Sequence, residues 1–141
     1  MIDKELVFRK LKLITKDLKA LKPISYLSEK EYFEKPTFEI QAERYLERII
    51  GRMLDINYHI ITENDNPPPS DYFESFIEMG KLKVLPLDFS RKIAPYAGLR
   101  NRLVHEYNAL DEKKVYEAMK SLIKDTPEYF QFVEKYLKKQ K

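Results

Sequence analysis

The chain has 141 residues, a length typical of one domain that can bury a substantial core. Hydrophobic residues make up 43% and charged residues 35%, and there are only 3 glycines, which favours a helical protein over a loop-rich or all-β fold. The lack of cysteine excludes disulfides and thiolate metal sites, and a net charge of +3 permits a polyanionic partner without requiring one.

Targeting signals are also missing from the sequence. No apolar run approaches the ~20 residues that a membrane-spanning helix needs. The N-terminal residues lack the basic start and apolar stretch of a signal peptide. We therefore expect a cytoplasmic protein that has no membrane partner.

Apolar residues recur at helical spacing along most of the chain, and no strand pattern competes with them. The pattern predicts helices over residues 3–22, 37–62, 71–80, 88–107 and 111–124, with a further helical stretch resuming at Thr126-Pro127. Connections between them are short enough for antiparallel neighbours. We expect one all-α domain over residues 1–141, an antiparallel up-and-down bundle of about five helices.

Caps and prolines set the expected helix boundaries. Asp3, Ser70 and Asp111 are expected to cap the helices that follow them. Pro23 is expected to end or kink the first helix, and Pro95 to kink the fourth.

Two further segments carry structural expectations. Residues 28–35 are expected to form a polar connection that contains Tyr32 and Phe33. Gly51 lies in the middle of a predicted helix, where glycine costs about 1 kcal/mol relative to alanine. We expect it to permit the close approach of a neighbouring helix or of a second copy of the chain.

The segment from residue 99 to 107 gathers three side chains with useful chemistry. The guanidinium of Arg100 can hold a phosphate, and the imidazole of His105 can move a proton near neutral pH. The phenol of Tyr107 can act as a nucleophile or a modification target. Because the chain has only two histidines, this placement is distinctive.

Helical geometry separates these side chains. Arg100 and Tyr107 are nearly two turns apart and share a face, whereas His105 lies roughly 140° around the helix from Arg100. One regular helix therefore does not form a tight pair of Arg100 and His105, and a distorted turn or a second chain is needed. On residue types alone the other interpretation is a solvated helix face formed by Arg100, Arg102 and Glu106. His105 would then lie near the helix C-terminus, where its cation is favoured, and Tyr107 would be a half-buried packing residue.

The segment Arg100–Tyr107 resembles the Arg-x4-His-x-Tyr signature of the HepT toxins, a branch of the HEPN superfamily. The resemblance continues in Tyr72–Glu78, Ala94–Asn101, Glu43–Arg48 and Asp55–Ile61. It covers nearly the whole chain and is weakest near the two ends.

This resemblance implies a helical bundle that dimerises and places two signatures near the shared interface. It implies the toxin of a type II/VII-like toxin–antitoxin system, a metal-independent endoribonuclease that acts on RNA, with tRNA among the candidates, and not on DNA. Arg100 and His105 would then be the catalytic residues, with Asn101 and Arg102 in support. The attacking group would be the 2′-hydroxyl of the RNA.

The resemblance also implies a partner. MntA, a minimal nucleotidyltransferase antitoxin, would silence the toxin by transferring AMP from ATP to Tyr107. The chain has no Gly-rich phosphate loop, so ATP and Mg²⁺ would be used by the antitoxin and this chain would need no cofactor. The alternative function is a non-catalytic HEPN dimer that binds a nucleotide, RNA or a partner protein.

Two other pairs of side chains have spacings that suggest chemistry. Asp55 and His59 have the spacing of a metal pair, but two ligands of mixed type favour a hydrogen bond along the helix instead. Glu43 and Arg48 are expected to form helix-surface or interhelix pairs.

Overall fold

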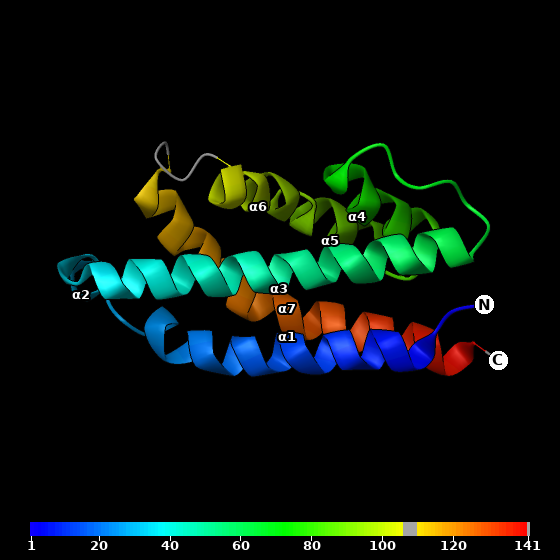
Figure 1. Ribbon diagram of the computed structural model, residues 1–141, viewed down its shortest axis with the longest axis horizontal. Helices are drawn as coiled ribbons and strands as arrows, with labels where there is room; N and C mark the ends of the chain where they lie inside the picture. Colours follow the sequence, from blue (N-terminus) through cyan, green and yellow to red (C-terminus); the bar gives the residue numbers. More distant parts are fainter. Residues whose placement is uncertain (106–109, 141) are drawn as a thin grey trace.

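The computed structural model describes residues 1–105 and 110–140, and these form an all-α bundle (Figure 1). Three long helices lie along its long axis: α1 (Lys4–Ser25), α3 (Pro36–Glu63) and α7 (Glu112–Lys139). The direction of α1 is opposite to that of α3 and α7. Within the described residues, no helix is both long and apolar enough to cross a membrane.

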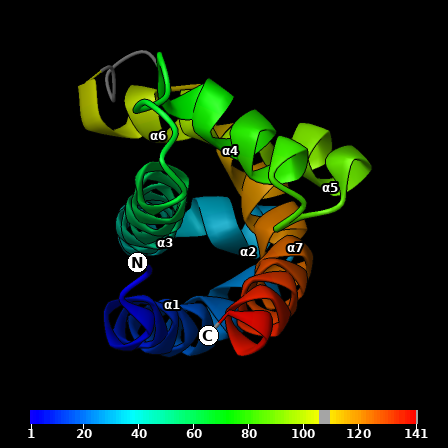
Figure 2. The ribbon, with the colours of Figure 1, turned by 90° about the vertical axis from the view of Figure 1, so that its right-hand side faces the viewer.

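A second layer of shorter helices covers the side of α3 that faces away from α1 (Figure 2). It consists of α4 (Tyr72–Lys81), α5 (Leu87–Ile93) and α6 (Tyr96–His105). The short α2 (Glu29–Glu34) joins α1 to α3 at one end of the bundle. Because α3 contacts α1, α2, α4, α6 and α7, it is the central helix of the fold.

The core follows from the apolar stripes of the long helices. Their inward side chains are fully buried and form one cluster with the inner faces of α4–α6. An ion-pair group around the buried Asp17 also joins α1 to α3, where Asp17 pairs with Arg48 at 3.0 Å and accepts a hydrogen bond from Arg52. Arg48 thus forms the interhelix pair that was expected of it. Representative buried residues are Leu11, Ile14, Leu46, Ile49, Met53, Phe76, Leu122 and Val133.

Several helix boundaries match the expected ones and others differ. The caps at Asp3 and Asp111 are confirmed, whereas the third helix is capped by Asp71 and not by Ser70. Residues 28–35 are not a simple polar connection, because Ser28 and Glu31 form a reciprocal capping box that starts α2.

Prolines act differently at their positions. Pro95 lies between α5 and α6 and divides the helix expected over residues 88–107 into two. In contrast α1 continues through Pro23 to Ser25, and α7 continues through Pro127. The predicted interruption near Pro127 is wrong because buried side chains on both sides of it hold α7 against the core.

Candidate functional site

The helix that carries the signature is fixed by its first turn and its apolar face. The Tyr96 hydroxyl donates to the buried Asp125 of α7 at 2.6 Å, and Lys92 pairs with the same carboxylate at 2.9 Å. Leu99 and Leu103 are buried, as their spacing predicts. These contacts set the direction of α6 over α3 and expose its other face.

Arg100 lies at an open groove between α3, α4 and α6. The groove has a volume of about 330 Å³, and its other lining residues are Gly51, Leu54, Asp55, Tyr58 and Tyr72. The Arg100 guanidinium carbon lies 5.4 Å from the centre of the Tyr72 ring. The Tyr58 and Tyr72 rings meet edge to face with centroids 5.9 Å apart. Two phenol rings and a cation therefore share one groove.

The charge of Arg100 is not neutralised by a carboxylate within the described residues, where no ion pair involves it. Its Nε is buried and lacks a hydrogen-bond partner there. A buried donor without a partner is costly, and a guanidinium has the donor geometry that matches a phosphate. This arrangement suits the binding of an anionic group in the groove.

The wall that carries Tyr72 is anchored by a buried polar network that the sequence analysis missed. The Tyr129 hydroxyl donates to Asn57 Oδ1 at 2.7 Å, and Asn57 Nδ2 donates to Ser75 Oγ at 3.1 Å. The Ser75 hydroxyl in turn donates to the backbone carbonyl of Tyr72 at 2.7 Å. The network joins α7, α3 and α4, and all three of its side chains are buried. A buried asparagine within an apolar stripe was the available signal.

The other signature residues do not line this groove. Asn101, Arg102 and His105 are exposed. Arg102 lines a separate groove of about 320 Å³ between α6 and the start of α7. His105, the last residue of α6, lines neither groove, so one chain does not bring it into the groove of Arg100.

Tyr107, the expected modification site, lies outside the described residues, as does Glu106.

Asp55 and His59 do not form a metal pair. Asp55 pairs with Lys10 at 3.0 Å, and His59 Nε2 accepts the backbone N–H of Asp3 at 2.9 Å. The hydrogen bond expected along the helix between these two side chains is not found among the described residues, and His59 instead fixes the N-terminal segment to α3.

A cluster of three carboxylates occupies the α2 end of the bundle. Oxygens of Glu39, Glu43 and Glu112 lie within 4.8 Å of one another. Burial, together with the neighbouring Glu112 and Glu39 carboxylates, raises the pKa of Glu43 to about 7. Burial also raises the pKa of Glu112. Glu43 was expected in a helix-surface or interhelix pair, and it instead meets a group of like charge across two helices.

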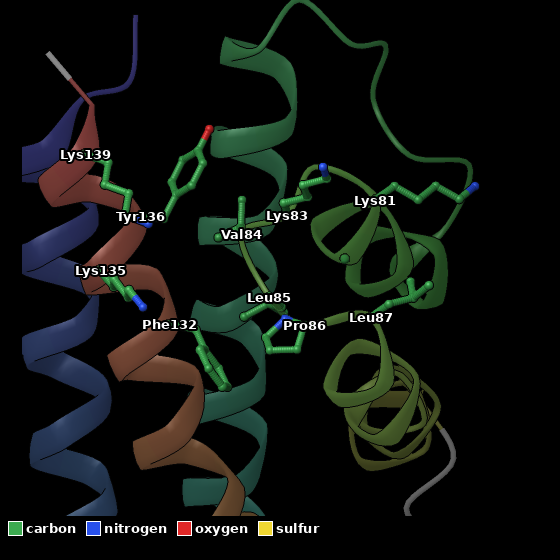
Figure 3. Close-up of a pocket in the computed structure, with 11 residues that line it drawn as sticks. Lys81, Lys83, Val84, Leu85, Pro86, Leu87, Phe132, Lys135, Tyr136 and Lys139 are labelled. Carbon is green, nitrogen blue, oxygen red and sulfur yellow. The ribbon is translucent and has the colours of Figure 1, made fainter.

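A larger groove lies between the α4–α5 connection and the C-terminal part of α7 (Figure 3). Its volume is about 560 Å³, with an apolar floor that includes Val84, Leu85 and Phe132. Lys83 and Lys135 are among the lysines around it. It shares no lining residue with the groove at Arg100.

Comparison with known proteins identifies relatives across almost the whole chain. A family model described as "HepT-like: Ribonuclease HepT-like" matches residues 14–136. The tRNA nuclease HepT of Aphanizomenon flos-aquae (strain 2012/KM1/D3) is 34% identical over 136 residues, which cover 96% of this chain and 92% of that protein.

Solved structures share the helical fold. The tri-AMPylated HEPN toxin of Shewanella oneidensis, in complex with MNT antitoxin, matches with a TM-score of 0.82 at 20% identity over 95% of this chain and 98% of that one. YutE of Bacillus subtilis, described as a cytosolic protein of unknown function, matches with a TM-score of 0.83 at 16% identity over 96% of this chain and 91% of that one.

Proposed function

Because this chain belongs to the HepT-like ribonuclease family, we propose that it is the toxin of a toxin–antitoxin system and that it cleaves RNA in the cytoplasm. The relationship to a tRNA nuclease supports tRNA as the substrate class. The observation that carries the proposal is the position of Arg100, which lines an open groove beside Tyr58 and Tyr72 and forms no ion pair among the described residues.

The chemistry assigned to the signature needs no metal. The RNA 2′-hydroxyl loses its proton and attacks the adjacent phosphorus, and the bond from phosphorus to the 5′-oxygen breaks. The imidazole of His105 takes the proton from the 2′-hydroxyl and a proton is returned to the leaving 5′-oxygen, so that the products are a 2′,3′-cyclic phosphate and a 5′-hydroxyl. Arg100 stabilises the charge that grows on the non-bridging oxygens. Asn101 and Arg102 support the site by contacts with the phosphates on either side.

In the proposed homodimer, His105 of one chain reaches the phosphate that Arg100 of the other chain holds. Arg100 faces its groove and His105 does not, so an active site formed within one chain would leave the proton-transfer group away from the phosphate. In the proposed dimer, Arg100 of one chain and His105 of the partner subunit act on one phosphate. Gly51 lines the same groove as Arg100, and a Cβ placed there would meet nothing within 4 Å among the described residues, which leaves room for a second chain. Its expected role against a neighbouring helix of the same chain is therefore wrong, and the second-copy role stays a prediction.

The test is cleavage of a tRNA pool by the purified chain in the presence of EDTA. We expect His105→Ala to slow cleavage about 10²–10⁴-fold and Arg100→Ala about 10²–10³-fold, because each removes a group that acts in the transition state. The matched controls are His59→Ala and Arg91→Ala, which alter a histidine and an arginine outside the groove. Parent-like rates in both signature variants would overturn the assignment of Arg100 and His105, whereas a parent chain that does not cleave RNA would favour the non-catalytic binding module.

We also assign the regulation of the toxin to Tyr107. In the proposed reaction its phenolic oxygen bonds to the α-phosphorus of ATP, pyrophosphate leaves with the electrons of the broken bond, and the phenolic proton passes to solvent. The MntA-like antitoxin uses the ATP and Mg²⁺. The likeness to a tri-AMPylated toxin bound to its antitoxin supports this assignment. The added phosphate groups would compete with RNA for Arg100 and Arg102.

Intact mass spectrometry tests the modification. Incubation with the antitoxin, Mg²⁺ and ATP should add AMP to the parent chain and not to Tyr107→Phe, and the modified parent should lose its cleavage activity. Equal labelling of the parent and of Tyr107→Phe would show that AMP is attached to another residue.

A further inference from the structure

The carboxylates of Glu39, Glu43 and Glu112 have the spacing of a cation site. Glu39 and Glu43 are four residues apart on α3 and share one face, and Glu112 is the first residue of α7. Each offers one oxygen, and these oxygens all lie within 4.8 Å of one another. Oxygen ligands that stand about 2.0–2.6 Å from a magnesium or calcium ion are separated by up to about 5 Å, so the spacing fits one ion.

A buried phenol provides an independent observation at the same place. Tyr32 of α2 is 0% exposed, and its hydroxyl has no hydrogen-bond partner within the described residues. Burial raises its pKa, and the charges of Glu112, Glu43 and Glu39 add to the effect, so all three carboxylates act on this hydroxyl. A buried hydroxyl is costly without a partner, and a water molecule held by a bound cation would provide one.

No positive side chain compensates the cluster. Among the described residues no lysine, arginine or histidine forms an ion pair with any of the three carboxylates. Two other titratable groups lie near the cluster. Asp111 adds negative charge next to Glu112, and the hydroxyl of Tyr116, which neighbours Tyr32, donates to the Leu27 carbonyl. The N-terminus of α7 contributes only about half a positive charge, enough for one carboxylate and not for three.

We propose that Glu39, Glu43 and Glu112 bind one divalent cation of the oxygen-preferring class, such as Mg²⁺, Mn²⁺ or Ca²⁺, with Tyr32 bonded to a water in its coordination shell. The ion joins α3 to the start of α7 and fixes the residue at which the chain re-enters the bundle, five positions after Tyr107. Neither Arg100 nor His105 is a ligand, so the site is structural and separate from the RNA chemistry.

Protons compete with the ion at this site. The Glu43 carboxyl contacts Glu112, and a proton shared by the pair is the alternative to a bound cation. Cation binding must displace that proton, so it strengthens as the pH rises. A site filled by a proton alone would show no dependence on metal.

Calorimetric titration of the metal-free chain with MnCl₂, MgCl₂ and CaCl₂ tests the proposal, without RNA. We expect one ion per chain for at least one metal at pH 7.5, weaker binding at pH 5.5, and at least tenfold weaker binding in Glu43→Gln and Glu39→Gln. Glu117→Gln, an exposed change of the same charge on α7, should bind like the parent. Tyr32→Phe should weaken binding about tenfold.

Thermal unfolding provides the second measurement, since glutamine keeps the shape of glutamate and helical content can be checked by circular dichroism. The same ion should raise the unfolding midpoint of the parent and of Glu117→Gln, and not that of Glu43→Gln. The absence of saturable binding, or equal binding by the parent and Glu43→Gln, would overturn the proposal. Because RNA plays no part in the readout, its failure is distinguishable from failure of the ribonuclease assignment.

Discussion

Arg100 owes its position to an aromatic ring and not to an ion pair. Its guanidinium carbon lies 5.4 Å from the Tyr72 ring centre, and Tyr72 is held by the network of Asn57, Ser75 and Tyr129. Stacking orients a guanidinium without neutralising its charge, so the charge stays available for a phosphate. Tyr72 is thus a positioning residue for the proposed chemistry.

Removal of the ring tests this role. Tyr72→Ala should lower kcat/KM for RNA cleavage about 2–5-fold, because a partly exposed cation–π contact contributes about 0.5–1 kcal/mol. Tyr72→Phe keeps the ring and should behave like the parent. Tyr26→Ala, a change at a tyrosine that is exposed elsewhere, is the control. A loss in Tyr72→Phe equal to that in Tyr72→Ala would assign the role to the hydroxyl instead.

The Glu43 carboxyl makes the stability of the metal-free chain depend on pH. Its pKa in the folded chain, about 7, lies above the ordinary value of 4.5. Between these values the folded state binds more protons than the unfolded state, so stability is greatest below about pH 4.5 for this group and falls as the pH rises through 7.

Urea unfolding in EDTA at pH 5 and pH 8 measures this effect. The midpoint of the parent should decrease between the two values by more than that of Glu43→Gln, which has no proton to lose. Glu117→Gln should keep the decrease of the parent. An equal change of the urea midpoint between pH 5 and pH 8 in all three chains would show that the cluster does not titrate in this range.

At the scale of elements, the corner between α4 and α5 depends on the absence of one side chain. A Cβ at Gly80 would lie 2.6 Å from Ser90 Oγ and 2.9 Å from Ser90 Cβ, closer than real contacts allow. At Gly51, in the interior of α3, a Cβ would meet nothing within 4 Å in the part of the chain that the structure describes. The two glycines therefore have opposite structural roles although both are helical.

Alanine substitutions distinguish the two roles. Gly80→Ala should destabilise the chain by about 1–3 kcal/mol, because the clash outweighs the gain in helix propensity. Gly51→Ala should stabilise the isolated chain by up to about 1 kcal/mol. Equilibrium urea unfolding under conditions that keep the chain monomeric measures both. Stabilisation by Gly80→Ala would mean that α4 and α5 separate easily.

The sequence predicted most helices, but it did not predict which prolines interrupt a helix. Periodicity located the long helices, since apolar stripes repeat whatever surrounds them. Pro95 ended a helix and Pro127 did not, and the difference depends on burial of the flanking residues in the finished bundle, which local sequence does not contain. Ser28 and Glu31 were a readable cap for α2, because the capping box is a local pattern.

The candidate site divides in the same way. The assignment of Arg100 and His105 as catalytic residues stays a prediction, whereas the expectation from helical geometry that they do not share a face agrees with the groove of Arg100, which His105 does not line. The stacking of Arg100 on Tyr72, from a helix far away in sequence, required the packing of α4 and α6 on α3. The acidic cluster was missed for the same reason, because Glu112 meets Glu39 and Glu43 only when α7 lies against α3.

At the scale of the whole molecule, one chain is incomplete for the proposed reaction. The described residues place Arg100 in its groove and His105 outside it, and the proposed ribonuclease chemistry needs both. A twofold dimer resolves this, because each of its two equivalent sites can take Arg100 from one chain and His105 from the partner subunit. The central claim is therefore an active site shared between chains.

Co-expression of an Arg100→Ala chain with a His105→Ala chain tests that claim most directly. Each variant alone should be inactive, whereas random pairing should restore roughly a quarter of the parent activity, because half of the dimers are mixed and each mixed dimer has one intact site of two. Purification through different tags on the two chains would place the recovered cleavage in the mixed dimer. Mixed dimers that stay as inactive as either variant would contradict a site that combines Arg100 and His105 from different chains.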